Sequence, residues 1–237
     1  MHQPDLAVAV AEFVLLIFSL CVHECAHAWM ASRLGDQTAR MEGRITLNPM
    51  AHVDPIGTLL FPALMIFGPF IGFTMFSGML VGWARPTPVT TRNFRKFVRD
   101  DNLTTLAGPA SNLLIALVAF AVLVVMIVII PDGRNVVLNS FFSALGDAGE
   151  MPPHPLALFC TLAILVNLSL CIFNLLPIPP LDGSHIVRNM LPYNAVQVYD
   201  RIPGWASYLF MILLGGTIIR AFLSPAIELM IWGLLHV

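Results

Sequence analysis

The stretch VHECAHA, residues 22–28, contains the pattern HExxH and lies in an apolar run that begins near Leu6. On an α-helix, His23 and His27 are four residues apart, about 400° of rotation, so both imidazoles project from one face and can bind one ion. Glu24 is offset by about 100°, so its carboxylate can act as a general base beside that ion without being a ligand. Two neutral imidazoles suit zinc, which lowers the pKa of water to about 7. The pattern therefore predicts metal-assisted hydrolysis.

A pattern this short also occurs by chance, so its surroundings decide how it is interpreted. The apolar run carries three ionisable side chains, those of His23, Glu24 and His27, in its last third. Such side chains are expensive in hydrocarbon and are functional by default. The alternative is that they pair with neighbouring helices and only stabilise the fold.

The composition is that of a polytopic membrane protein. Of the 237 residues, 57% are apolar and 11% are charged, and the mean hydropathy is +0.81. A soluble domain averages about 25% charged residues. No polar stretch is long enough for a soluble domain, so we expect one membrane-embedded domain over residues 1–237. The net charge of −2, without a basic stripe interleaved with aromatic residues, gives no indication of nucleic acid binding.

The apolar segments predict an all-α membrane fold with about four to six transmembrane segments. Three spanning helices are expected, followed by one long helix or a helix and a partial one; these segments cover residues 6–34, 103–130, 156–176 and 205–237. A polar loop is expected at residues 90–103, and polar connectors are expected at residues 131–155 and 184–204. Gly35 is expected to end the first helix.

Basic residues are concentrated in three of the connecting segments. Residues 33–44, 85–99 and 188–201 together carry ten lysines and arginines, whereas residues 131–155 carry one, Arg134. Because cytoplasmic loops of membrane proteins are enriched in Lys and Arg, we assign the first three segments to the cytoplasm. The HExxH helix then ends on the cytoplasmic side.

The apolar run at residues 56–83 is interrupted by Pro62, Gly68-Pro69 and further glycines. Since both flanking loops are assigned to the cytoplasm, this run must cross an even number of times, and it is too short for two spans of about 20 residues. We therefore expect a re-entrant or broken hairpin that turns near Gly68-Pro69. Such backbone is tolerated only where protein or water covers it. The alternative is a single helix of 28 residues.

Short β-strand pieces are expected near the active site. Residues 43–48 alternate apolar and polar side chains ahead of Pro49, a pattern typical of a strand. Residues 82–89 are expected to be extended because residues before proline avoid the helical region. Either piece could pair with an unwound substrate by strand addition.

A zinc ion held by two histidines needs a third protein ligand and an open position. If the broken hairpin returns to the cytoplasm, the third spanning segment ends on the same face as His23 and His27. Asp182 follows that segment after a proline run, and Gly183 permits a tight turn. A carboxylate at membrane depth is costly without a partner, and a metal supplies one. We predict Asp182 as the third ligand; the alternative is an ordinary interfacial turn.

Two asparagines are further candidates. Asn174 lies eight residues before Asp182, and its amide could donate a hydrogen bond to the oxyanion of a tetrahedral intermediate. An interhelical hydrogen bond is the alternative. Asn112 lies among small residues that permit close helix approach, so packing is its first interpretation and substrate positioning its second.

Three motifs together resemble the site-2 protease family of intramembrane zinc metalloproteases. They are HECAH at residues 23–27, AGPASN at 107–112 and NLLPIPPLDG at 174–183. The resemblance extends from about residue 10 to residue 190. It implies hydrolysis of peptide bonds within the membrane by a compact form that lacks the PDZ or CBS domain of many members.

The resemblance also assigns roles to residues. It implies that His23, His27 and Asp182 hold one zinc ion, with Glu24 as the base, and that Asn174 positions the scissile carbonyl or stabilises its oxyanion. The implied substrates are membrane-spanning proteins. We expect a multi-pass protein of a prokaryotic cell membrane with its active site toward the cytoplasm, and the oligomeric state stays open.

Two other classes of function remain as alternatives. A zinc transporter could use the same ligands without hydrolysis, but transport needs polar residues spread along several helices, and here they gather toward one face. A non-catalytic membrane scaffold is the other alternative, and the intact Glu24 argues against it.

Overall fold

The computed structural model describes residues 5–73, 84–146 and 152–237. Within these ranges the fold is helical and contains no β-strand. The longer helices are α1 (Leu6–Leu34), α4 (Phe97–Ile129), α5 (Gly133–Ala144), α6 (Pro155–Asn174) and α9 (Gly204–Leu235). Shorter helices are α2 (Thr38–Met41), α3 (Phe61–Phe67), α7 (Asp182–Met190) and α8 (Tyr193–Tyr199).

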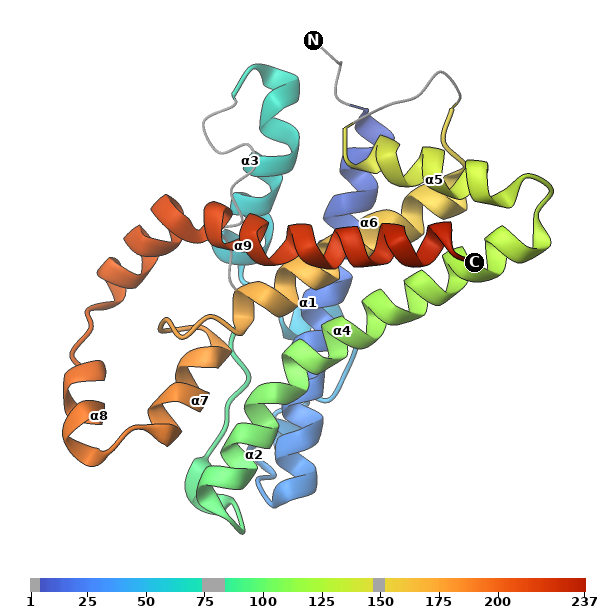
Figure 1. Cartoon of the computed structure of the whole chain (residues 1–237). Helices are drawn as coiled ribbons and strands as arrows, with labels where there is room; N and C mark the ends of the chain where they lie inside the picture. Colours follow the sequence, from blue (N-terminus) through green and yellow to red (C-terminus); the bar gives the residue numbers. More distant parts are fainter. Residues whose placement is uncertain (1–4, 74–83, 147–151) are drawn as a thin grey trace.

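Four helices in the described ranges are long and apolar enough to cross a membrane. They are Leu6–Leu34, Phe97–Ile129, Pro155–Asn174 and Gly215–Leu235, the last being most of α9. This confirms an all-α, multi-pass membrane protein. In Figure 1, α9 runs across the bundle that the other three form.

Helices α1, α4 and α6 pack against one another and form the centre of the molecule (Figure 1). Contacts between α1 and α4 join His27 to Thr104 and Ser19 to Asn112, so the two helices run antiparallel. Their outer halves enclose an apolar core with α5, α6 and α9, whose largest fully buried side chains include Leu123 and Phe141.

The ends of α1 follow from its sequence. The Asp5 carboxylate accepts a hydrogen bond from the Ala7 N–H and caps the first turn. At the other end Gly35 has a φ of 119°, a left-handed conformation that favours glycine, and its N–H donates to the Ala31 carbonyl. The predicted end of the helix at Gly35 is confirmed.

Helix α4 begins six residues earlier than the prediction of a spanning helix from residue 103. The Asp100 carboxylate accepts the Lys96 N–H and so satisfies one of the free donors of the first turn. Asp100 and Asp101 are both buried, and Asp101 accepts a hydrogen bond from Asn189 of α7. Tertiary contacts thus extend the helix into a segment whose polarity predicted a loop.

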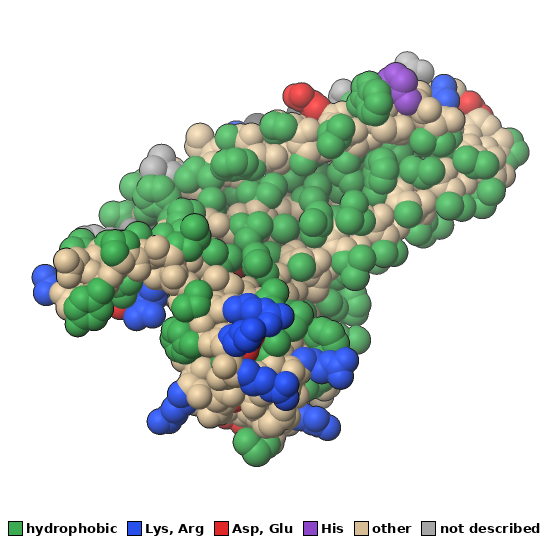
Figure 2. Space-filling model, turned by 60° about the horizontal axis from the view of Figure 1, so that its bottom comes forward, with side chains coloured by type: hydrophobic (Ala, Val, Ile, Leu, Met, Phe, Trp, Pro, Cys, Tyr) green, Lys and Arg blue, Asp and Glu red, His purple; other side chains and the backbone are tan. Residues whose placement is uncertain are grey.

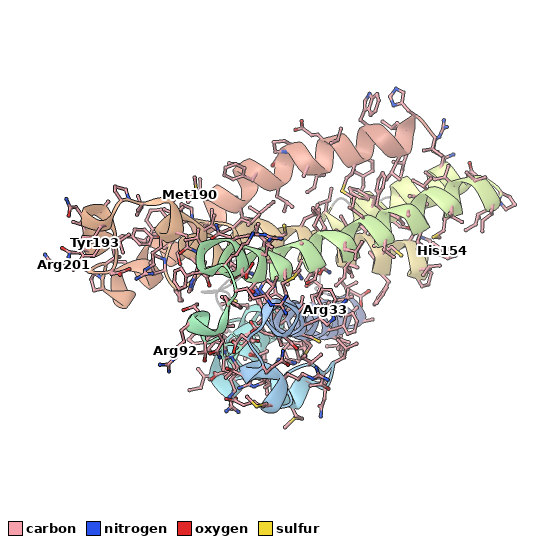
Figure 3. All side chains as sticks on the ribbon, turned by 90° about the horizontal axis from the view of Figure 1, so that it is seen from below. Arg33, Arg92, His154, Met190, Tyr193 and Arg201 are labelled. Carbon is pink, nitrogen blue, oxygen red and sulfur yellow. The ribbon has the colours of Figure 1, made fainter. Side chains whose placement is uncertain are left out.

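The polar connectors predicted at residues 131–155 and 184–204 contain helices, which the sequence analysis did not predict. Helix α5 buries Val137 and Phe141 against α4 and α6. Helix α7 packs on α4, and α8 is held by the bidentate ion pair of Arg188 and Asp200. In Figure 3, Met190 and Tyr193 of these helices lie at the opposite end of the molecule from His154, which precedes α6.

The apolar run that begins at residue 56 does not form one helix of 28 residues. A π-helical turn, Pro55–Leu60, leads into α3, and a 3-10 turn, Gly68–Ile71, ends the helical stretch. Gly72 then adopts a left-handed φ of 77°, and the Phe73 N–H donates to the Gly68 carbonyl. The expected return half lies largely in residues 74–83, outside the described residues, so the hairpin stays a prediction.

The strand predicted at residues 43–48 is an irregular loop. The Asn48 N–H donates to the Thr46 hydroxyl, and the Thr46 carbonyl contacts the His52 imidazole at 2.9 Å. Side chains and the backbone carbonyls of α2, rather than a neighbouring strand, pair with this backbone. Residues 84–89 of the second predicted piece also have no regular secondary structure, and residues 82–83 lie outside the described residues.

The surface separates apolar from basic side chains. Hydrophobic side chains cover the long helices, and lysines and arginines gather on the lobe that carries the end of α1 and the start of α4 (Figure 2). Arg33 and Arg92 lie in this part of the molecule (Figure 3).

Candidate active site

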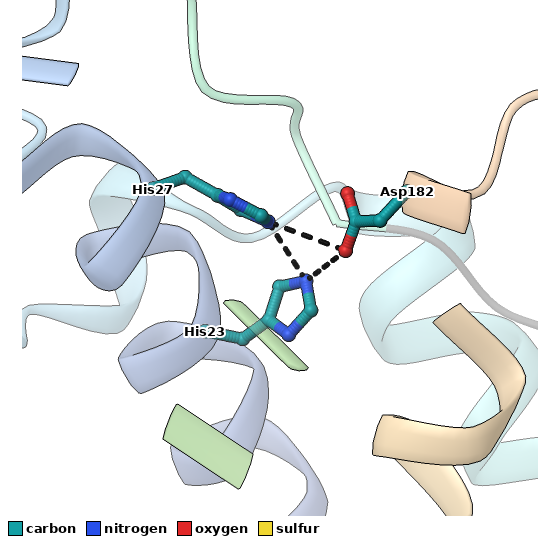
Figure 4. Close-up of side chains that lie close together, drawn as sticks. All are labelled: His23, His27 and Asp182. Carbon is teal, nitrogen blue, oxygen red and sulfur yellow. Dashed lines mark hydrogen bonds and ion pairs between the residues drawn. The ribbon is translucent and has the colours of Figure 1, made fainter. Parts of the chain in front are cut away.

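Residues 159 positions apart in the sequence meet in the middle of the bundle. His23 and His27 project from consecutive turns of α1, and Asp182 is the first residue of α7. The Asp182 Oδ2 atom lies 3.1 Å from His23 Nε2 and 3.4 Å from His27 Nε2, and the two Nε2 atoms are 3.0 Å apart (Figure 4). The structure thus brings together the three predicted metal ligands.

The atoms in this triangle have the spacing and chemistry of a metal site. Atoms bound to a tetrahedral zinc at about 2.0–2.2 Å lie about 3.3–3.6 Å from one another, close to the observed spacing. Asp182 Oδ2 is buried and has no hydrogen-bond partner. His27 Nδ1 lies 2.7 Å from the Thr104 carbonyl, which can only accept, so Nδ1 carries the proton and Nε2 presents a lone pair. A shared cation would satisfy both acceptors, so these residues fit zinc.

Asp182 is ionised in this setting. Burial raises the pKa of its carboxyl group, but the positive charge that His27 and His23 carry when they are protonated lowers it further, and the net pKa is below its ordinary value. A carboxylate rather than a carboxylic acid therefore faces the two imidazoles.

Gly108 of α4 forms the wall behind the imidazoles, and the sequence analysis did not select it as a site residue. A Cβ atom at this position would overlap His27 Nε2 and the His23 ring. Glycine therefore sets how closely α4 can approach the metal site. Its place in the AGPASN motif was the only sequence signal, because the contact joins two helices that are distant in the chain.

Gly183 follows Asp182 and has a comparable steric role. A Cβ atom here would overlap the Leu175 and Leu176 carbonyl groups. The chain between α6 and α7 folds back tightly on itself at this point, and this brings Asp182 to α1.

Glu24 lies on the adjoining face of α1 and is held by the segment at residues 84–90. The Thr87 N–H donates to Glu24 Oε2 at 3.0 Å, and the Thr87 hydroxyl lies 2.8 Å from the same oxygen. The segment is fixed on both sides of this contact, since the Arg85 N–H donates to the His52 carbonyl and the Thr90 N–H donates to Asp36. Sequence analysis did not identify Thr87 because its contact is 63 positions away.

A cavity of about 590 Å³ adjoins these residues. Glu24, Asp182 and Asn174 line it, together with Thr87 and apolar side chains of α1, α3 and α6. Asn174 is partly buried and donates one amide hydrogen to the Leu170 carbonyl of its own helix. The second amide hydrogen has no such contact within the described residues.

Asn112 lies behind His23 and does not line this cavity. It is fully buried, and its Oδ1 is 2.6 Å from His23 Nδ1. A direct contact with substrate, the second interpretation of this residue, is at odds with this burial, because the His23 ring lies between Asn112 and the other two ligands.

The model of peptidase family M50 matches residues 11–216 of this chain. The chain belongs to peptidase family M50, the site-2 proteases. Two relatives are named as proposed zinc metalloproteases. YwhC of Bacillus subtilis is 33% identical over 94% of this chain and 84% of its own length. Rip2 of Mycolicibacterium smegmatis is 28% identical over 86% of this chain and 68% of its own length. No solved structure matches the chain.

Membership in the site-2 protease family agrees with the four apolar helices and with the buried His-His-Asp cluster. The protein is an intramembrane zinc metalloprotease, and it is a multi-pass integral membrane protein.

Proposed function

We propose that His23, His27 and Asp182 hold the catalytic zinc ion and that Glu24 is the general base for hydrolysis of a peptide bond in a membrane-spanning substrate. The observation that carries this proposal is the convergence of the three candidate ligand atoms within 4.8 Å of one another, on a cavity that Glu24 also lines.

Zinc, when bound, polarises the scissile carbonyl and lowers the pKa of water. Glu24 accepts a proton from the attacking water and delivers it to the amine that leaves. Asn174 lies on the same cavity and has a second amide hydrogen to donate to the oxygen of the scissile carbonyl as negative charge develops there. Thr87 holds the Glu24 carboxylate toward the cavity through two hydrogen bonds.

The substrate in this proposal is a transmembrane helix that unwinds locally. Amides of an intact helix are hydrogen-bonded and shielded, so unwinding precedes attack. The segment at residues 84–90 borders the cavity, and it could align the unwound chain by strand addition. The first two residues of the predicted piece at residues 82–89 lie outside the described residues.

The active site is proposed to face the cytoplasm of a prokaryotic cell. The basic residues gather near the end of α1 that follows the HExxH motif, as the positive-inside rule requires for a cytoplasmic end. We further propose that residues 1–237 act as one membrane-embedded domain.

The test replaces the base and keeps the ligands. Glu24→Gln should retain one zinc ion per chain and lose cleavage of a membrane-spanning reporter by at least about 100-fold. His27→Ala should lose both zinc and cleavage. Retained cleavage in Glu24→Gln would refute the assignment of the base, and full zinc content in His27→Ala would refute the ligand set.

A further inference from the structure

Two buried asparagines connect the metal site to the interior of the bundle. Asn112 of α4 and Asn167 of α6 are both 0% exposed, and together with His23 they form an unbroken chain of side-chain contacts. His23 Nδ1 lies 2.6 Å from Asn112 Oδ1, and Asn112 Nδ2 donates to Asn167 Oδ1 at 2.9 Å. Asn167 Nδ2 donates to the Ala163 carbonyl at 2.9 Å. We propose that Asn167 is a positioning residue that fixes the tautomer of the zinc ligand His23 by acting through Asn112.

The direction of every hydrogen bond in this chain follows from its last member. The Ala163 carbonyl can only accept, so Asn167 must turn its NH₂ group toward it and its Oδ1 toward Asn112. Asn112 must then donate to Asn167 and present its own oxygen to His23. A backbone carbonyl of α6 therefore sets the orientation of both amides.

The consequence reaches the metal ligand. Because Asn112 offers an acceptor, His23 Nδ1 has to carry the proton, and His23 Nε2 presents a lone pair to the site. His27 reaches the same tautomer by a direct contact with the Thr104 carbonyl. If Asn112 were free to rotate by 180°, its NH₂ group would face His23 Nδ1 and favour the opposite tautomer, which cannot bind zinc through Nε2.

No contact outside this series of hydrogen bonds fixes the orientation of the Asn112 amide as firmly as the contact with Asn167 does. Besides Asn167, the amide nitrogen of Asn112 has a longer contact of 3.4 Å with the Ser19 carbonyl. Two fully buried amides in membrane-spanning helices are costly unless their polar atoms are paired. Any hydrogen-bonded pairing of these two amides would support association of the helices. Zinc binding through His23 Nε2, in contrast, requires the one arrangement described above.

The decisive experiment is a double-mutant cycle in which zinc affinity is measured. The inference rests on the proposed function in one respect, namely that His23 is a zinc ligand. Zinc affinity of the purified full-length chain would be measured by chelator competition for the wild type, Asn112→Leu, Asn167→Leu and the double variant. Each single variant should bind zinc about 10–100-fold more weakly. The double variant should bind no more weakly than Asn112→Leu, because Asn167 acts only through Asn112.

Thr161→Val is the matched control. Thr161 is also fully buried on α6, but its hydroxyl donates to the Ala157 carbonyl of the same helix rather than to Asn112 or Asn167. We expect zinc affinity within about twofold of the wild type. Wild-type affinity in Asn167→Leu, or additive losses in the double variant, would overturn the inference.

A measurement on the unmodified sequence covers the case in which a variant does not fold. Nitrogen-15 spectra of the zinc-loaded wild-type chain with labelled histidine report which ring nitrogen carries the proton and which one binds the metal. The inference predicts a protonated Nδ1 at His23, and a protonated Nε2 would overturn it. If the wild-type chain binds zinc without His23, the proposed function itself fails instead.

Discussion

At the residue scale, the proposed metal site depends on the lack of a side chain at Gly108 as much as on the proposed ligands. The imidazoles of His23 and His27 pack directly on the Gly108 backbone, in space that a Cβ atom would occupy. The close approach of α4 to α1 therefore requires a residue without a side chain.

Gly108→Ala is expected to weaken zinc binding by at least about 10-fold, because the new methyl group displaces both imidazoles. Zinc content after dialysis against a chelator measures this. Gly204→Ala is the control, since nothing lies within 4 Å of a Cβ atom there. Equal zinc content in the two variants would contradict the packing that the structure shows.

Thr87 offers a second test at this scale. Thr87→Val keeps the shape of the side chain and removes the hydroxyl next to Glu24 Oε2. A hydrogen bond to a charged group contributes about 1.5–3 kcal/mol, so kcat for reporter cleavage should fall by about 10-fold or more while zinc content is unchanged. Thr87→Ser should restore kcat, and an unchanged kcat in Thr87→Val would show that Glu24 needs no such support.

Sequence alone identified the residues whose chemistry is unusual for hydrocarbon. His23, Glu24, His27 and Asp182 stand out because charged or ligating groups are costly there. Gly108, Thr87 and Asn167 did not stand out, because each acts through a contact with a distant helix or segment. Such partners become visible only when the helices are placed side by side.

At the scale of elements, Asp36 joins the end of α1 to the segment that carries Thr87. Its carboxylate accepts hydrogen bonds from Thr38, from the Thr90 N–H and from the Asn93 amide, and its side chain is fully buried. The segment at residues 84–90 is thus fixed to the helix that carries two of the proposed metal ligands.

Asp36 should make stability depend on pH. Burial raises the pKa of Asp36, but hydrogen bonds from Thr38, Thr90 and Asn93 lower it further, so the net pKa is below its ordinary value of 3.8. The folded state then binds this proton less readily than the unfolded state. The stabilisation is present above about pH 4 and is lost as the pH falls through the lowered pKa.

Asp36→Asn removes this charge and is expected to lower the free energy of unfolding at pH 7 by about 1–3 kcal/mol. Unfolding in detergent at several pH values measures it. The difference between wild type and variant should shrink on acidification below about pH 4. A difference that is constant with pH would mean that the Asp36 charge does not contribute.

Elements were predicted well where one local signal dominates. The bounds of α1 follow from an apolar run that ends at glycine, and α3 ends at Phe67, directly before the predicted break at Gly68. Helices α5, α7 and α8 were not predicted. Helix α5 packs on α4 and α6, and α7 packs on α4, so tertiary contacts stabilise helices that their polar sequences do not indicate.

At the scale of the whole molecule, the arrangement of helices gathers basic residues near the end of α1 that follows the proposed metal ligands. The order of the spanning segments brings the end of α6 and Asp182 to α1, as the charge asymmetry of the loops predicted. The irregular loop at residues 43–48 shows the limit of such reasoning, since a strand needs a partner that the sequence does not name.

Labelling of single cysteines tests the proposed orientation. Arg92 and Arg134 are exposed, and their segments are predicted to lie on opposite sides of the membrane, so each is replaced by cysteine in turn. In a chain whose four native cysteines are replaced by alanine, a membrane-impermeant maleimide added to intact cells should label position 134 and not position 92. The reverse pattern would place the active site on the outside.

The position of the zinc ion tests the central claim most directly. Anomalous diffraction at the zinc absorption edge, from crystals of the wild-type protein, should give one strong peak within about 2.2 Å of His23 Nε2, His27 Nε2 and an Asp182 oxygen. A zinc peak bound by other residues, with these three side chains apart, would contradict the account.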